Sequence, residues 1–257
     1  MKITCLVENT ATNNCSAEHG LSLYIEANGL NLLFDMGQSD LFAKNAEILS
    51  VNIDKIDIAI LSHGHYDHGG GLSKFLKLNK SAPVYIPQNA FVAHYNGQNK
   101  YIGLDNELIS NSRLKIVTTN TQIAHGLTII THNSVPTLHK FGCFGLKKEQ
   151  DGKIIDDDFD HEQYLLIEDG SKRVLISGCS HRGILNIVEA IHPDIVIGGF
   201  HTSKMELDDE LKNLGNDLAK FNCRYYTCHC TGQEQFEFMQ KKVEDLFYLS
   251  AGQTITL

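Results

Sequence analysis

The chain has 257 residues, of which 42% are hydrophobic, and a net charge of −9 with histidine counted as neutral. That length and composition allow one large domain with a sizeable core. The acidic balance argues against broad nucleic-acid binding, which needs a basic surface to neutralise phosphates. An anionic small molecule remains a possible partner, because a bound metal reverses the local charge.

The seven cysteines are odd in number and irregularly spaced, and no apolar run reaches the about 18 residues of a membrane span. Met1-Lys2 leads directly into an alternating segment and not into a signal segment. We therefore expect a cytoplasmic protein with free thiols and no membrane partner. The sequence does not indicate an oligomeric state.

The first part of the chain predicts strands. Apolar and polar residues alternate from Ile3 to Val7, which is typical of a strand. Apolar segments at 21–27 and 30–34 flank Asn28-Gly29, whose tolerance of positive φ predicts a hairpin. We expect a helix over residues 41–49, capped by Ser39, and then a buried strand at 56–61.

The rest of the chain mixes strands and helices. Further strands are expected at 83–86, 114–118, 127–131, 164–168, 173–177, 194–198 and about 223–227, with a closing strand that reaches Leu257. Helices are expected near 72–76 and at 182–191, about 206–220 and about 233–245. Because no repeat or linker interrupts this order, we expect residues 1–257 to form a single α/β domain, with two sheets face to face and helices outside.

Four potential metal ligands follow the strand at 56–61, in the segment His63-Gly64-His65-Tyr66-Asp67-His68. Packed together, these imidazoles and the carboxylate would leave polar groups unpaired unless a divalent metal satisfied them. Such ligands suit zinc foremost, and also manganese or iron. His63 and His65 point to one side of an extended segment, while Asp67 and His68 follow around a turn. We therefore expect two adjacent metal sites.

This H-x-H-x-D-H pattern, together with Leu32-Leu33-Phe34-Asp35-Met36-Gly37, resembles the metallo-β-lactamase superfamily. The resemblance implies an αββα sandwich with two metals at one edge of the sheets, and it makes Asp35 a residue that orients the histidine loop. It also implies a third histidine for the first metal, an aspartate that bridges both metals, and a final histidine for the second.

Those later ligands depart in part from the superfamily pattern. The strand at 173–177 is followed by Gly178-Cys179-Ser180-His181, with cysteine in the place of the bridging aspartate. We expect His181 to bind metal, and leave Cys179 open between a thiolate ligand and an inert buried thiol. His229, between a strand and a helix, is the expected final ligand. Cys228 and Cys230 could instead form half of a structural zinc site, but no second pair at suitable spacing is evident.

Other histidines are harder to place. His201 ends the strand near 195–200 and is a candidate general acid or substrate ligand, with an ordinary loop histidine as the alternative. His19, in Glu18-His19-Gly20, is a weaker candidate for the rim of the site, and His139 is a reserve ligand for the first metal. The sequence indicates no function for His94, His125, His132, His161 and His192. Residues 87–162 are predicted only as an insertion that covers a substrate.

A narrower resemblance rests on four motifs. Glu18-His19-Gly20-Leu21-Ser22, Gly178-Cys179-Ser180-His181, Gly198-Gly199-Phe200-His201 and His229-Cys230-Thr231-Gly232 are similar to the branch named for 7,8-dihydropterin-6-methyl-4-(β-D-ribofuranosyl)aminobenzene 5′-phosphate synthase. The resemblance implies a pterin condensation, but the name of a branch does not establish a substrate.

The residues favour a hydrolase in which two divalent metal ions activate water for attack on an anionic small molecule, a phosphoester or phosphodiester. In this hypothesis Asp67 binds metal and orients the nucleophile, and His201 protonates the leaving group. The alternatives are the pterin synthase, a transferase, and a ligand-binding protein with a degenerate site, which the replaced aspartate suggests. A di-iron redox role would need a flavin-binding domain, for which the chain has no room.

Overall fold

The computed structural model describes residues 1–257 and contains two large sheets of seven strands each, in agreement with the expected pair of sheets. The first sheet has the strand order β18-β1-β2-β3-β4-β5-β8. Its strands are β1 (Lys2–Val7), β2 (Ser22–Ala27), β3 (Leu30–Phe34), β4 (Ile58–Ile60), β5 (Val84–Pro87), β8 (Leu114–Val117) and β18 (Thr254–Thr256).

The second large sheet has the order β17-β16-β15-β14-β13-β10-β9, and a small third sheet has the order β12-β11-β6-β7. The strands of the second sheet are β9 (Thr121–Ala124), β10 (Leu127–Thr131), β13 (Gln163–Asp169), β14 (Lys172–Ile176), β15 (Ile195–Gly198), β16 (Arg224–Thr227) and β17 (Leu246–Tyr248). Those of the third are β6 (His94–Asn96), β7 (Lys100–Tyr101), β11 (Leu146–Gln150) and β12 (Lys153–Asp156).

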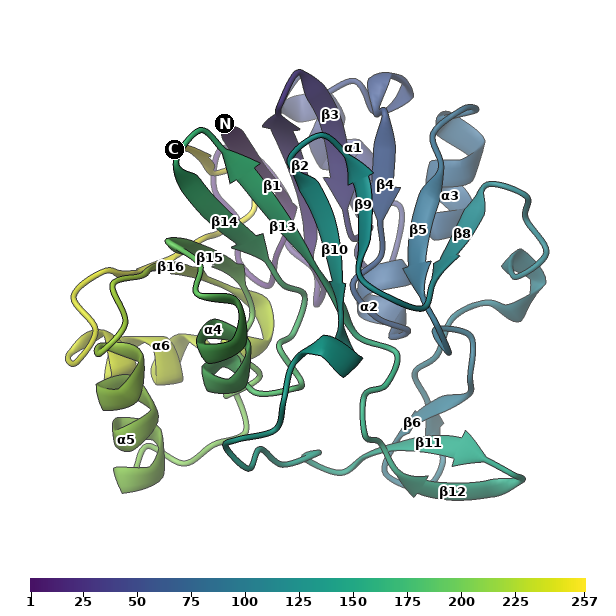
Figure 1. Cartoon of the computed structure of the whole chain (residues 1–257). Coiled ribbons are helices and arrows are strands. Elements are labelled where there is room, and N and C mark those ends of the chain that lie inside the picture. Colours follow the sequence, from purple (N-terminus) through teal and green to yellow (C-terminus); the bar gives the residue numbers. More distant parts are fainter.

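Helices cover the outer faces of the two large sheets, as Figure 1 shows. The α-helices are α1 (Leu41–Ile48), α2 (Tyr66–Gly69), α3 (Leu72–Leu78), α4 (Ile184–Ile191), α5 (Asp209–Leu218) and α6 (Gln233–Gln240). Short 3₁₀ turns lie at Ile53–Lys55, Asn106–Leu108, His132–Ser134 and His229–Thr231. No helix is long and apolar enough to span a membrane.

Three apolar clusters fill the interfaces between the layers. One lies between the sheets and joins residues such as Leu23 and Ile60 of the first sheet to Leu165 and Ile197 of the second. A second packs the first sheet against α1 and α3, and a third packs the second sheet against α4, α5 and α6. Three buried interfaces define four layers, so the αββα sandwich is confirmed.

The hairpin predicted at Asn28-Gly29 is present and sets the register of β2 against β3. Ala27 pairs with Leu30, so only the two turn residues lie between the strands. Their φ angles are 51° and 78°, the left-handed values that a tight hairpin turn requires. A second tight hairpin joins β13 to β14, where Asp169 pairs with Lys172.

Residues 87–162, expected only as an insertion that covers a substrate, contribute strands to all three sheets. β8 extends the first sheet, β9 and β10 extend the second, and the remaining strands form the third sheet. In Figure 1 the labelled strands β6, β11 and β12 of this small sheet lie below the two large sheets, on the side of α2. The segment therefore contributes to both halves of the sandwich and to the edge at which the ligands were predicted.

Two helices have bounds in the structure that differ from the predicted ones. α5 begins at Asp209 because Asp208 accepts hydrogen bonds from the backbone N–H groups of Glu210 and Leu211 and so caps the helix. The helix predicted to reach residue 245 ends at Gln240. Residues 241–245 form turns and lead into β17, which the sequence pattern did not indicate. At α1 the first turn starts after Asp40, and the Ser39 hydroxyl accepts a hydrogen bond from the N–H of Leu41 at 3.1 Å.

Candidate metal centre

The predicted ligands meet at one edge of the sandwich because parallel strands end there. β3, β4, β5 and β8 run parallel in the first sheet, and β14, β15, β16 and β17 run parallel in the second. Carboxyl ends of parallel strands share an edge, so the loops that follow them converge. The loops after β3 and β4 carry Asp35 and the segment 62–68, and those after β14, β15 and β16 carry Cys179 with His181, His201 and His229.

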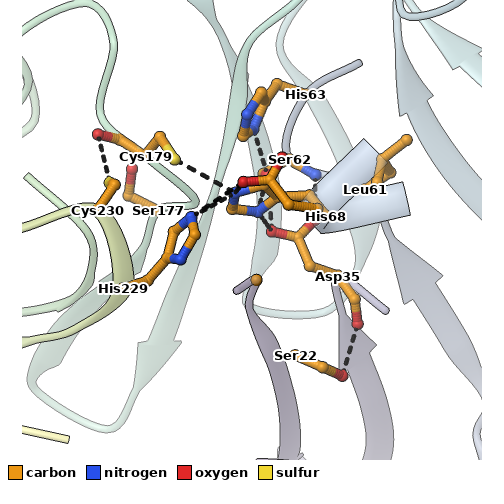
Figure 2. Close-up of polar contacts among 12 residues, drawn as sticks. Ser22, Asp35, Leu61, Ser62, His63, His68, Ser177, Cys179, His229 and Cys230 are labelled. Atoms are coloured by element: carbon orange, nitrogen blue, oxygen red, sulfur yellow. Dashed lines mark hydrogen bonds and ion pairs between the residues drawn. The ribbon is translucent and has the colours of Figure 1, made fainter. Parts of the chain in front are cut away.

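Asp35 contacts His68 directly and reaches His63 through Ser62, as Figure 2 shows. Its carboxylate lies 2.7 Å from Nδ1 of His68 and 2.7 Å from the hydroxyl of Ser62. A carboxylate only accepts, so both groups donate to it, and the Ser62 oxygen is then free to accept from Nδ1 of His63 at 2.8 Å. In their neutral forms His63 and His68 therefore both carry their proton on Nδ1 and leave Nε2 unprotonated. Burial opposes the charge of His68, but the carboxylates of Asp35 and Asp67 raise its pKa.

His229 is held in the same tautomer from another direction. Its Nδ1 lies 3.0 Å from Oδ1 of Asn9, an oxygen that also accepts from the N–H of Gly20. Nε2 of His229 is then a lone-pair nitrogen, and it lies 3.1 Å from Nε2 of His68. If both rings are neutral, two buried lone pairs at that distance repel each other, and either a shared proton or a metal cation removes the conflict. This pair is the clearest sign of a metal position.

Two further donors complete this first group. The Sγ atom of Cys179 lies 3.2 Å from Nε2 of His68, and Oδ2 of Asp67 lies 3.4 Å from Nε2 of His229. Atoms about 2.0–2.3 Å from a tetrahedral zinc lie about 3.3–3.7 Å apart, so the donors are spaced as such an ion requires. Burial opposes the charge of Asp67, but His68, His19 and His229 hold the pKa of its carboxyl well below the usual range.

A second group of donors surrounds His63. Nε2 of His181 lies 3.4 Å from Nε2 of His63, and Cys179 is close enough to belong to both groups. Nδ1 of His181 is buried without a partner, while Glu162 accepts from the backbone N–H of His181 at 2.7 Å and fixes the loop. Burial lowers the pKa of both imidazoles well below the usual value, so both are neutral and able to bind a metal.

His65 faces a group that the sequence did not indicate. Its Nε2 lies 3.9 Å from Oδ2 of Asp157, and the same oxygen lies 3.2 Å from a nitrogen of His94 and of His161. All four side chains are buried. His94 and His161, for which the sequence indicated no function, thus belong to a buried polar cluster. His94 begins β6 and His161 follows β12, so no local spacing could indicate their contact.

Three further candidate histidines lie at different places relative to the donor groups. His201 lies beside His181, with ring centroids 4.2 Å apart, and its Nδ1 is buried without a partner. His19 lies at the rim, with Nε2 3.2 Å from Asp67, as expected of the weaker candidate. The reserve ligand His139 lies away from the centre and pairs with Glu189 on α4.

The cysteines near the C-terminus point in different directions. Cys228 is buried in the core between the sheets, whereas Cys230 lies near Cys179 and His201. A structural half-site that uses Cys228 and Cys230 together is therefore not formed. Burial raises the pKa of the Cys179 thiol, and the neighbouring Cys230 adds to that shift. Because a bound cation favours the thiolate, metal binding would offset this burial.

A cavity of about 370 Å³ opens over these groups. Its lining combines metal-type donors with two lysines and a few apolar residues. The lining residues are His19, His65, Tyr66, Asp67, Asn96, Lys100, Ile102, Leu146, Cys179, His181, His201, Ser203, Lys204, His229 and Cys230. Lys100 comes from the third sheet, and Lys204 donates to the carbonyl of Phe144 at 2.9 Å, so the segment 87–162 forms part of the wall.

The edge of the four-layer fold brings together imidazole, carboxylate and thiol groups of the kinds that can hold a divalent metal ion. The chain belongs to the metallo-β-lactamase superfamily, whose family model matches residues 16–225. The resemblance found in the sequence is thereby confirmed.

Individual relatives agree with this assignment. A protein named as the dihydropterin ribofuranosylaminobenzene phosphate synthase of Methanocaldococcus jannaschii is 31% identical, over 99% of this chain and 96% of its own length. An uncharacterised protein of the same organism is 32% identical, over 90% of each chain. A crystal structure described as a metal-dependent hydrolase of the β-lactamase superfamily has a TM-score of 0.87 and 30% identity, and the match covers 100% of this chain and 99% of that one.

Proposed function

We propose that this protein is a hydrolase of phosphoesters or phosphodiesters with a binuclear metal centre, zinc being the preferred ion. The observation that carries the proposal is the pair of buried Nε2 atoms on His68 and His229, 3.1 Å apart, beside a second donor group at His63 and His181. Cys179 adjoins both groups, in the position where the superfamily resemblance places a bridging ligand. Two neighbouring ions are the arrangement that suits displacement at phosphorus.

We assign one ion to Asp67, His68 and His229, and the other to His63, His65 and His181. When bound, the metals supply an activated water near neutral pH and offset charge on the substrate. The carboxylate of Asp67, kept ionised by its histidine neighbours, can accept a hydrogen bond from that water and orient it. This role requires the low pKa that the surroundings of Asp67 produce.

The walls of the cavity suit an anionic substrate. Lys100 and Lys204 line it from opposite parts of the chain and place positive charge beside the metal donors, in a protein of net charge −9. His201 lines the same cavity next to His181 and is placed to protonate a leaving oxygen. A phosphate group between the lysines and the donors would therefore have its leaving group within reach of an acid.

The test uses metal-free protein reloaded with zinc or manganese and assayed on bis(p-nitrophenyl) phosphate and p-nitrophenyl phosphate. We expect turnover that depends on metal and falls at least about 100-fold in H229A, because one donor of the paired nitrogens is lost. H139A is the matched control, since His139 is exposed and pairs only with Glu189. Turnover of neither substrate by the metal-loaded protein, or equal loss in both variants, would contradict the proposal.

A second candidate is the pterin condensation, a transferase reaction. It is favoured by the 31% identity to the named synthase over 99% of this chain. The same donors would then hold the phosphate or pterin oxygens of the two substrates. Incubation with a pterin pyrophosphate and the ribofuranosylaminobenzene phosphate separates the two functions. Pyrophosphate release that requires both substrates supports the synthase, and hydrolysis of one substrate alone supports the phosphoesterase.

A further inference from the structure

Residues 87–162 place a buried carboxylate behind His65. His94 begins β6, while Asp157 and His161 follow β12, and all three side chains are fully buried. Their contacts join the third sheet to the loop 62–68. None of the three belongs to the two donor groups described above, so their clustering needs a separate explanation.

The tautomer of His161 is determined by the backbone of the metal loop. The N–H of Gly64 donates to Nδ1 of His161 at 2.9 Å, so the proton of this neutral imidazole is on Nε2. Nε2 then donates to Oδ2 of Asp157 at 3.2 Å. With its proton there, Nε2 of His161 has no lone pair for a metal. The cluster is therefore better explained as a hydrogen-bonded anchor than as a further metal site.

Asp157 is held firmly by these contacts. Its Oδ1 accepts from the N–H of Phe159 at 2.8 Å, and its Oδ2 faces His94 and His161 at 3.2 Å each. Burial opposes its charge, but the histidines around it hold the pKa of this carboxyl well below its usual range. A fixed anion therefore stands behind the metal loop.

His65 is the fourth side chain of this buried cluster. Its Nε2 is buried, has no hydrogen-bond partner, and lies 3.9 Å from Oδ2 of Asp157. A carboxylate at this position favours the proton on Nε2, which leaves Nδ1 as the lone-pair nitrogen of a ring that lines the cavity. A small rotation of the ring would close the remaining gap to hydrogen-bond length.

We propose that Asp157 is a positioning residue that selects the tautomer of His65 and orients it as a metal ligand, as Asp35 does for His68. This inference rests on the proposed metal centre, and it gives the third sheet a role at that centre. His94 and His161 act by keeping the carboxylate in place.

The first test compares zinc affinity in wild type, D157N and D156N, measured by competition with a chromophoric chelator. We expect the zinc affinity of D157N to fall about 10- to 100-fold at one of two positions, with a changed visible spectrum of the cobalt-substituted protein. D156N is the matched control, because Asp156 is exposed and pairs only with Lys147. Wild-type affinity and spectrum in D157N would overturn the inference.

The number of bound ions distinguishes the other explanation. If wild type binds three ions and D157N binds two, Asp157 is itself a ligand and the proposed role is wrong. If wild type binds no metal, the proposed function fails, and the inference is judged by the next measurement.

The second test needs no variant and so is independent of folding. Imidazole ¹⁵N chemical shifts of the metal-free wild-type protein report the tautomer of each histidine. We expect His65 to carry its proton on Nε2 and His68 to carry it on Nδ1. A proton on Nδ1 of His65 would overturn the inference even if the protein binds two metals.

Discussion

The substitution D35N probes the residue on which two ligands depend. Asp35 accepts three hydrogen bonds of 2.7 Å, from the N–H and hydroxyl of Ser62 and from Nδ1 of His68. An asparagine keeps the volume, and it tolerates the left-handed backbone, with φ of 59°, that an alanine would strain. The change therefore isolates the loss of charge and of acceptors.

The amide of D35N can accept at only one of its two atoms. Its NH₂ group would then face a donor, and at least one buried donor would lose its partner, at a cost of about 1–3 kcal/mol. The simplest relief is a change of tautomer at His68, which removes the lone pair from Nε2. We expect zinc affinity to fall about 10- to 100-fold, as for other losses of a carboxylate behind a metal-binding histidine.

Two assays separate the parts of this effect. Urea unfolding in the presence of a chelator gives the loss of stability without the contribution of bound metal. Zinc titration of the folded variant then gives the loss of affinity. A variant that is destabilised by about 1–3 kcal/mol but binds zinc like wild type would refute the tautomer argument, because Asp35 would then be only a structural acceptor.

Three further predictions concern pH, substrate binding and packing. Burial lowers the pKa of His161 to about 3, whereas an unfolded histidine titrates near about 6.5, so the unfolded state of the metal-free protein binds an extra proton between these values. The free energy of unfolding of the metal-free protein should therefore fall by about 1.4 kcal/mol per pH unit for each such histidine as the pH drops below about 6. A free energy of unfolding in urea that does not change with pH in this range would contradict the prediction. K204A should raise KM for a phosphate substrate about two- to fivefold and leave kcat unchanged, whereas a pure kcat effect in steady-state kinetics would exclude a binding role. G178A should weaken zinc binding and lower the free energy of unfolding in urea by about 1–3 kcal/mol, because the new Cβ would collide with the hydroxyl of Ser62. The control G215A makes only ordinary contacts and should be neutral or stabilising. Equal effects of the two substitutions would disprove the packing argument.

The parts of the fold that the sequence predicted correctly are those with local signals. Asn28-Gly29 needs only its own backbone preferences to form a turn, and the apolar segment before His63 needs only its neighbours to form a buried strand. The motif at 63–68 is likewise dense enough to indicate a site by itself. The family resemblance then indicated His181 and His229 as further ligands, and in the structure both lie beside that motif.

The residues that were missed act across long distances in the chain. Asp157 lies in the segment 87–162, which the sequence predicted only as a covering insertion, and its contact with His65 depends on how the third sheet folds back. Glu8 is similar, since it accepts from the N–H of His229 at 2.6 Å across nearly the whole chain. Neither contact follows from periodicity or spacing, because the partners meet only in the finished tertiary structure.

The donors are divided between the two halves of the sandwich. His63 and His68 belong to the loop after the first sheet's β4, and Cys179, His181 and His229 belong to loops of the second sheet. His68 and His229 are 161 residues apart in sequence yet adjacent in space. A metal ion held between them would join distant parts of the chain, and because its donors come together only in the folded state, its binding free energy would add to the free energy of unfolding. The metal supply would then set part of the stability of the fold, as well as whether the cavity can do chemistry.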